Sequence, residues 1–246
     1  MEFTIIIPAR YDSVRFPGKV LADFKGKPLI QHVFENATQS GATRVIIATD
    51  DDRIKDVAES FGAELCMTSA DHESGTDRLA EVVTALDLDD DEIVVNLQAD
   101  EPQLTADWIR AAVEDLIEFE TAKVSTLSVP ITDAEDLNNP NIVKIVTNKR
   151  GVPMLFSRAP IPWGRDTNGQ MQEKAIEAGL YQRHIGLYVY RCSFLHEYLQ
   201  WSPSPLEELE RLEQLRILWY GRRMHVKMLD KIAPHGVDTP EDLERL

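Results

Sequence analysis

The chain has 246 residues, enough for one large domain or for a domain with an added lobe. Apolar residues make up 43% and charged residues 28%, an ordinary globular composition that excludes the fibrous and disordered classes. The net charge of −16 disfavours general binding to nucleic acid or to anionic membranes. The aliphatic run 5–7 is too short for a signal peptide or a membrane span. Cys66 and Cys192 have neither zinc spacing nor a disulfide framework, so we expect a reduced, cytoplasmic protein.

The first half of the chain alternates strand and helix patterns. Short β-branched runs predict buried strands at 3–7, 44–49, 63–67 and 92–97. Amphipathic segments predict helices at 28–40, 50–60, 76–86 and 105–119. Four consecutive strand–helix units predict an α/β fold with a doubly wound, mostly parallel sheet that carries helices on both faces.

From about residue 122 the pattern becomes richer in short strands and turns. Strands are predicted at 123–129, 142–147, 152–157 and 185–190, and helices at 193–200 and 205–220. The polar segment 164–179 is expected to be a mobile loop with one helical turn. A strand at 225–229 should return to the main sheet, and Thr239-Pro240 should begin a last helix. We therefore expect a single domain over 1–246 with a smaller β-rich lobe, at about 122–220, that forms a lid or an oligomer surface.

The first strand–helix connection, residues 8–19, is where a doubly wound fold is expected to bind its ligand. It has the spacing of neither a dinucleotide fingerprint nor a P-loop. Between Arg10 and Lys27, however, five basic residues stand against two acidic ones. Arginine and lysine here would suit a triphosphate arriving at an acidic protein. The alternative is a solvated surface loop that happens to be basic.

Two acidic positions are candidates for a metal site. Asp100 lies in the run 96–102 at the carboxyl end of the fourth predicted strand, and Asp238 precedes the last predicted helix. Carboxylates suit a hard cation such as Mg²⁺, and two of them converging would fit metal-assisted phosphoryl or nucleotidyl transfer. The alternative is that both are turn or helix-capping residues.

Three further positions have both a functional and a structural interpretation. His184 precedes an apolar strand and is either a ligand or a satisfied histidine. Arg158 opens a proline-rich stretch that either fixes it for carboxylate recognition or packs as the edge of the lobe. Glu213-Gln214 lies on a leucine-rich helix that is otherwise typical of core or interface.

Taken together, these segments resemble the 3-deoxy-manno-octulosonate (KDO) cytidylyltransferase family across nearly the whole chain. The matching runs are 7–11 with 17–19, 48–50, 71–78, 96–102, 139–141, 156–159, 183–188, 212–216 and 236–240. The wider sugar nucleotidyltransferase superfamily shares only the first of these runs, so the later ones indicate this family. The resemblance implies a Rossmann-like nucleotidyltransferase fold.

The resemblance also implies the reaction and its residues. CTP and a KDO-type sugar acid would give a CMP-sugar and pyrophosphate, which activates the sugar for lipopolysaccharide assembly. The implied catalytic residues are Arg10, Lys19, Asp100 and Asp238. Of these, Arg10 and Lys19 would hold the triphosphate, whereas Asp100 and Asp238 would ligate Mg²⁺. The implied cytosine and ribose contacts are Ala9, Ser74, Gly75 and Arg78. The implied sugar-acid contacts are Gln98, Arg158, His184, Tyr188, Glu213 and Gln214. A homodimer through the second-half lobe is expected as well.

One departure from the family pattern bears on the acceptor. Ala99 stands where the family's run has glycine, and it would either be strained at positive φ or narrow the space beside Gln98. Asp12, Val14 and Phe16 also differ from the commoner residues of the phosphate loop. The acceptor is therefore KDO or a close derivative such as 8-amino-8-deoxy-KDO. The alternatives are a cytidylyltransferase for a sialic-acid-type sugar and a catalytically silent nucleotide-binding regulator on the same fold.

Overall fold

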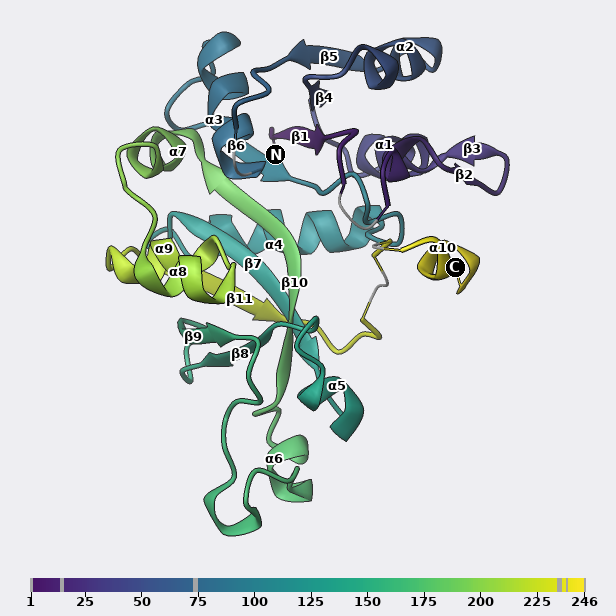
Figure 1. Cartoon of the computed structure of the whole chain (residues 1–246). Helices are drawn as coiled ribbons and strands as arrows, with labels where there is room; N and C mark the ends of the chain where they lie inside the picture. The colour runs from purple at the N-terminus through teal and green to yellow at the C-terminus, as the bar shows by residue number, and fades with distance from the viewer. Residues whose placement is uncertain (1, 14–15, 73–74, 234–235, 238, 246) are drawn as a thin grey trace. The chain divides into compact units, whose positions relative to one another are not determined.

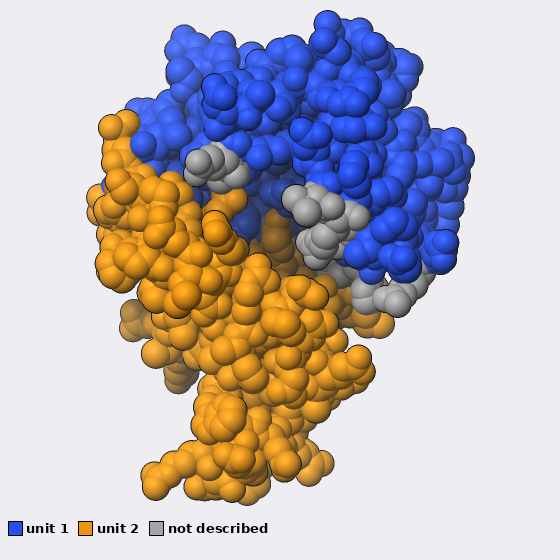
Figure 2. Space-filling model, in the orientation of Figure 1, with its two compact units in different colours: residues 1–113, 187–199, 234–246 blue, residues 114–186, 200–233 orange. Residues whose placement is uncertain are grey.

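Figure 1 presents a computed structural model of the chain, which describes residues 2–13, 16–72, 75–233, 236–237 and 239–245. The chain divides into two compact units, shown in different colours in Figure 2. Unit 1 comprises residues 1–113, 187–199 and 234–246, and unit 2 comprises residues 114–186 and 200–233. Helix α4 (Ala106–Glu118) and strand β10 (Gln182–Arg191) each run from one unit into the other.

Unit 1 is built on a mostly parallel sheet. Its strands are β1 (Thr4–Ala9), β4 (Arg44–Thr49), β5 (Glu64–Met67), β6 (Ile93–Asn96) and the second half of β10. β1 pairs in parallel with β4 and β6, β4 pairs in parallel with β5, and β10 runs antiparallel to β6. The parallel sheet predicted from the four strand–helix units is thereby confirmed. A small hairpin of β2 (Asp23–Phe24) and β3 (Lys27–Pro28) stands where the sequence predicted only a loop.

The helices of unit 1 lie close to their predicted positions. They are α1 (Leu29–Thr38), α2 (Asp52–Ser60), α3 (Gly75–Ala85), most of α4, α7 (Cys192–Tyr198) and α10 (Pro240–Arg245), with a 3-10 turn η1 (Lys19–Leu21). Helix α1 buries Leu29, Ile30, Val33 and Ala37, a spacing that forms one apolar stripe. Asp51 caps α2 by accepting a hydrogen bond from the Arg53 amide at 2.9 Å.

Unit 2 combines short strands with short helices. Its strands are β7 (Val124–Pro130), β8 (Lys144–Thr147), β9 (Pro153–Ser157), the first half of β10 and β11 (Met224–Met228). β11 pairs in parallel with β7, so the predicted return of this strand to the sheet is confirmed. β8 runs antiparallel to both β10 and β9. The helical segments are α5 (Ala134–Asn138), η2 (Arg165–Thr167), α6 (Glu173–Glu177), α8 (Pro205–Glu210) and α9 (Gln214–Trp219).

Two predictions for unit 2 are corrected by the structure. The single helix predicted at 205–220 is two helices, α8 and α9, because Arg211 adopts the left-handed conformation with φ 55° and ends the first. The segment 164–179 holds two short helical elements, η2 and α6, rather than one turn. Ile176 of α6 packs against a small apolar cluster that contains Ile131 and Tyr181, which accounts for the extra order. Among the described residues, no helix is both long and apolar enough to cross a membrane.

Candidate functional site

The predicted phosphate loop follows β1 and is folded against Tyr11. The Gly18 amide donates to the Tyr11 carbonyl at 2.8 Å, and Gly18 has a left-handed φ of 72°. A Cβ at position 18 would lie 3.0 Å from the Tyr11 ring, so this turn requires glycine. The Arg53 guanidinium lies 3.3 Å from the centroid of the same ring. The Gly18 turn thus presents Lys19 in a defined conformation. The departure at Val14 lies outside the described residues.

Lys19 ties two distant acidic segments together. Its ammonium forms an ion pair with Asp100 Oδ2 and donates to the Val237 carbonyl at 3.0 Å. The Val237 amide in turn donates to the Asp100 carbonyl at 2.9 Å. The structure therefore brings Lys19, Asp100 and the residue before Asp238 to one place in unit 1. Asp238 itself lies outside the described residues.

The Asp100 carboxylate fits a hard cation. It follows the carboxyl end of β6, its side chain is 29% exposed, and it already attracts the Lys19 ammonium. Within the described ranges, no group of three or more His, Cys, Asp and Glu side chains could hold a metal alone. An ion here would therefore need water and substrate oxygens as further ligands, the coordination that Mg²⁺ favours.

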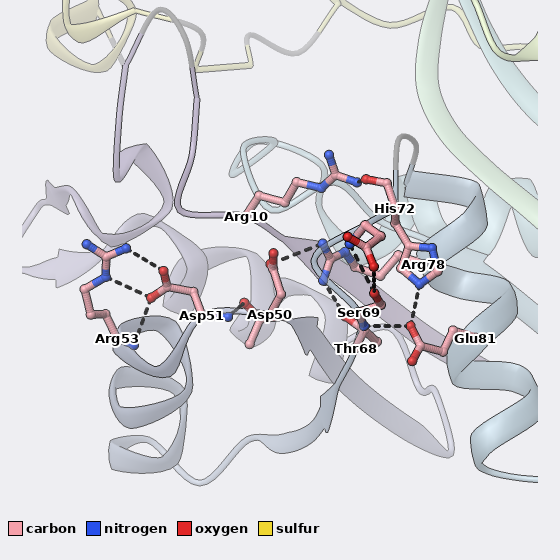
Figure 3. A network of polar contacts seen from close by, with 11 residues as sticks. Arg10, Asp50, Asp51, Arg53, Thr68, Ser69, His72, Arg78 and Glu81 are labelled. Carbon is pink, nitrogen blue, oxygen red and sulfur yellow. Dashed lines mark hydrogen bonds and ion pairs between the residues drawn. The ribbon is translucent and has the colours of Figure 1, made fainter.

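Arg78 of helix α3 is the most unusual charged group in unit 1 (Figure 3). Its side chain is fully buried, donates to Thr68 Oγ1, and lies 3.1 Å from Asp50 Oδ1. Burial lowers the pKa of Arg78, and the Asp50 carboxylate opposes that change. Its Nη2 is the atom that faces Asp50, whereas its Nε has no hydrogen-bond partner among the described residues. Because buried N–H donors are rarely left unsatisfied, this Nε–H is the donor that suits an acceptor on a ligand.

The segment before α3 is anchored to that helix. Glu81 accepts the Ser69 amide at 2.9 Å and forms an ion pair with His72 (Figure 3). Burial alone would raise the pKa of Glu81, but the bonds from His72 and the Ser69 amide lower it. Arg10 donates to the His72 carbonyl, so the predicted triphosphate arginine also lies at this segment. Ser74 lies outside the described residues.

Gly75 and Gln98 lie close together in unit 1. A Cβ on Gly75 would be 3.7 Å from Gln98 Nε2 and 3.8 Å from the Pro8 ring, so the start of α3 lies near the end of β1. Gln98 donates to Asn96 Oδ1 at 3.0 Å. Tyr188 of β10 is the register partner of Asn96. These residues come from four separate segments of the chain and lie around the carboxyl ends of β1 and β6.

The two alanines of the predicted site are both buried. Ala9, at the end of β1, pairs with Thr49 of β4 and is 1% exposed. Ala99 is 3% exposed and is not among the non-glycine residues of the described chain that have positive φ. Strain from a positive φ is therefore excluded at Ala99, and a narrowing of the space beside Gln98 by its methyl group stays a prediction.

In unit 2, His184 is held in the interior. It forms a 3.0 Å hydrogen bond with Thr126 Oγ1, and its ring meets Phe156 edge-on with centroids 5.1 Å apart. Burial lowers the pKa of His184 to about 3, so the ring is neutral at ordinary pH. A neutral imidazole here suits a hydrogen bond to a hydroxyl group, whereas it supplies no charge.

Arg158, Glu213 and Gln214 belong to the end of β9 and the start of α9. Arg158 makes hydrogen bonds to the carbonyls of Glu210 and Pro140, at 2.7 and 2.9 Å. Glu213 stands at the N-terminal end of α9, and Gln214, its first residue, is buried. The three residues are thus set in the same part of unit 2, with Arg158 held beside the connection that leads into α9.

Several residues that hold the predicted site residues in place were not themselves predicted from the sequence. Asp50 pairs with Arg78, Glu81 anchors the segment that carries His72, and Glu210 holds Arg158. Asp50 stands in a run that carried the family resemblance, which was a usable signal. Glu210 lies in a leucine-rich segment whose pattern predicts packing alone, so nothing in the sequence distinguished it.

Comparison with known proteins identifies the family of this chain. A family model described as "Cytidylyltransferase" matches residues 4–227, so the chain is a cytidylyltransferase. It is 54% identical over 246 residues to the 3-deoxy-manno-octulosonate cytidylyltransferase of Coxiella burnetii, covering 100% of this chain and 98% of the relative. The enzyme of the same description from Haemophilus influenzae is 54% identical over 248 residues, covering 100% of this chain and 97% of the relative.

A solved structure of CMP:2-keto-3-deoxy-manno-octonic acid synthetase complexed with CTP is also similar. It is 40% identical to this chain, with a TM-score of 0.88, over 99% of this chain and 95% of the other. The chain belongs to the 3-deoxy-manno-octulosonate cytidylyltransferase family, as its sequence motifs predicted.

Proposed function

We propose that the chain transfers CMP from CTP to KDO in a Mg²⁺-dependent reaction and thereby activates the sugar for lipopolysaccharide assembly. The observation that best supports this is that Lys19 contacts both Asp100 and Val237. A lysine suited to binding the triphosphate thus lies beside a carboxylate suited to binding Mg²⁺. Val237, which is bonded there to Asp100 as well, directly precedes Asp238, the second proposed ligand, in the sequence. Because CTP is made and used in the cytoplasm, a CTP-dependent reaction would place the protein there.

In this reaction the anomeric hydroxyl of the sugar acid attacks the α-phosphorus of CTP. A new P–O bond forms as the bond to the bridging oxygen breaks, pyrophosphate leaves, and the hydroxyl proton passes to solvent. Mg²⁺ bound at Asp100 and Asp238 would offset the negative charge that grows on the phosphate oxygens. Arg10 and Lys19 would hold the triphosphate in line, and positioning with electrostatics would supply most of the acceleration.

The remaining predicted residues receive binding roles. For the nucleotide we propose Ala9, Ser74, Gly75 and Arg78, of which Arg78 offers a buried Nε–H that has no partner among the described residues. For the sugar acid we propose Gln98, Arg158, His184, Tyr188, Glu213 and Gln214. Arg158 is the cation among these and suits the carboxylate of the acceptor.

The test is pyrophosphate release with CTP and KDO, with and without Mg²⁺, and identification of the CMP-sugar by mass spectrometry. We expect turnover only with all three. Lys19→Ala should chiefly raise the KM for CTP, and an unchanged CTP dependence would make residues 8–19 a solvated surface loop. CTP binding without turnover on KDO, 8-amino-8-deoxy-KDO or a sialic acid would favour the silent regulator instead.

We also propose that the chain forms a homodimer through unit 2. Large apolar side chains of this unit are exposed, and Met154 of β9 and Leu209 of α8 are 66% and 80% accessible. Side chains of this kind gathered on one lobe are typical of an interface between protein chains. Sedimentation equilibrium should give a dimer whose dissociation constant rises for Leu209→Glu, whereas a native monomer would remove this proposal.

A further inference from the structure

Glu210, the last residue of α8, accepts hydrogen bonds from two consecutive residues at the end of strand β9. The Ser157 hydroxyl donates to Glu210 Oε1 at 2.7 Å, and the Arg158 amide donates to Oε2 at 2.7 Å. Both carboxylate oxygens are therefore occupied by neutral donors on consecutive residues. These bonds orient the end of β9, and they do so without pairing the carboxylate with the Arg158 guanidinium.

The Arg158 guanidinium is held by backbone carbonyls instead of by the carboxylate. Its Nε donates to the Glu210 carbonyl at 2.7 Å and its Nη1 to the Pro140 carbonyl at 2.9 Å. A third, long bond of 3.5 Å joins Nη2 to the Arg211 carbonyl. A guanidinium has five N–H donors, so two remain after these three bonds. Since carbonyls are neutral, the group keeps its full positive charge for an anion.

Lys144 holds the turn at residues 139–142, which includes the Pro140 carbonyl that Arg158 contacts. It is fully buried and donates to the carbonyls of Asn139 and Ile142 at 2.7 and 2.6 Å. Burial lowers the pKa of Lys144, the nearby Arg158 lowers it further, and Glu210 opposes both. The turn that presents the Pro140 carbonyl to Arg158 is thus fixed from within the unit.

Helix α9 is fixed to α8 by a separate buried pair. Arg216 donates to both oxygens of Glu207 at 2.7 and 2.6 Å, and Glu207 completes the capping box of α8 with Ser204. The connection between the two helices is therefore held at both ends. Glu213 and Gln214, at the start of α9, keep a fixed place relative to Glu210 and the guanidinium of Arg158.

We propose that Glu210 is a positioning residue for the acceptor half of the reaction. By holding Ser157 and Arg158 from its carboxylate and its carbonyl, it aims the two remaining N–H donors of Arg158 at the carboxylate of the sugar acid. This inference rests on the proposed function, because it assumes an acceptor that carries a carboxylate. Glu210 touches no substrate and acts only through Arg158.

The test compares Glu210→Ala and Glu210→Gln with Glu208→Ala and Glu208→Gln. Glu208 lies on the same helix and is exposed, and within the described part of the chain its side chain forms no hydrogen bond to β9, which makes it a matched control. We expect Glu210→Ala to raise the KM for the sugar acid at least about tenfold while the KM for CTP stays within about twofold. Glu210→Gln, which keeps one acceptor oxygen, should show a smaller rise, and both Glu208 variants should behave as the native protein.

A purely structural role gives a different result. It would lower the melting temperature and the active fraction, hence kcat, but leave both KM values as in the native protein, and that outcome would overturn the proposal. If Glu210→Ala fails to fold, Glu210→Gln and Ser157→Ala decide, and each should raise the acceptor KM alone.

A binding measurement separates this inference from the proposed function. Native protein that binds KDO in the presence of CTP but does not turn it over contradicts the proposed function only. Calorimetric binding of KDO to native protein, Glu210→Gln and Glu208→Gln then still tests the inference. Weaker binding confined to Glu210→Gln would support it, and equal binding, or no binding to native protein, would overturn it.

Discussion

Two buried arginines, Arg78 in unit 1 and Arg216 in unit 2, differ in how fully their N–H donors are satisfied by the protein. Arg216 donates to both oxygens of Glu207, and this bidentate pair joins two short helices. Arg78 is more deeply buried, yet it has one hydroxyl acceptor and an ion pair between its Nη2 and Asp50, and its Nε lacks a hydrogen-bond partner among the described residues. The bidentate pair fits a structural role, and the unsatisfied Nε–H fits a ligand.

The largest expected effect separates these two arginines directly. Arg216→Met would leave the Glu207 carboxylate buried without its partner, at a cost of about 3–5 kcal/mol, which lowers the melting temperature by roughly 10 °C. Arg78→Met leaves Asp50 without its partner, but the Asp50 side chain is 21% exposed and water can reach it, so this variant should melt closer to the native temperature and lose CTP binding. Thermal unfolding and calorimetry with CTP measure both. An equal loss of stability in the two variants would make Arg78 structural.

The next prediction concerns the acidic side of unit 1. Asp100→Asn should cut turnover at least about 100-fold, or about 2.7 kcal/mol, because an amide is a poor ligand for a hard cation. Asp238→Asn should do the same, and both variants should fold. Steady-state rates at saturating Mg²⁺, with melting curves alongside, are the measurement. Near-native turnover in either variant would identify that residue as a turn or cap residue.

A smaller effect is expected from His184 in unit 2, which is buried and neutral. Its pKa is about 3 in the folded protein against 6.5 ordinarily, so below pH 6.5 the unfolded chain binds a proton that the folded chain does not. Stability should therefore fall as the pH drops from 6.5 towards 3, by at most about 1.4 kcal/mol per pH unit from this group. Denaturant unfolding at pH 7, 6, 5 and 4 should show a shallower decline for His184→Gln, and parallel curves would contradict this assignment.

The smallest effect is expected at Ala99. Ala99 is buried, and we expect its methyl group to narrow the space beside Gln98; a change of this size discriminates between close analogues by about tenfold. We expect 8-amino-8-deoxy-KDO to have the higher kcat/KM in the native protein and Ala99→Gly to shift the ratio towards KDO. Competition assays with both sugars measure this ratio. A native preference for KDO that Ala99→Gly leaves unchanged would show the substitution to be neutral.

Local patterns in the sequence were sufficient for most of unit 1. The apolar stripe of α1 and the buried β-branched run of β1 follow from periods of 3.6 and 2 residues, which depend on neighbours in the chain. The ends of the predicted helices 28–40 and 50–60 lie within two residues of α1 and α2. The family motifs also supplied the proposed site residues, although they did not say what holds those residues in place.

Contacts between distant segments decided the rest. Helix 205–220 has an unbroken leucine pattern, yet it breaks at Arg211, directly after the residue whose carbonyl accepts the Arg158 side chain from 52 positions away. Likewise, Asp50 meets Arg78 only because β4 and α3 lie in one unit. The sequence by itself determined the strand–helix units and the family, because periodicity and motifs both depend on residues that are close together in the chain. Only the tertiary structure decided which charges are satisfied and which remain available, because each partner comes from another part of the chain.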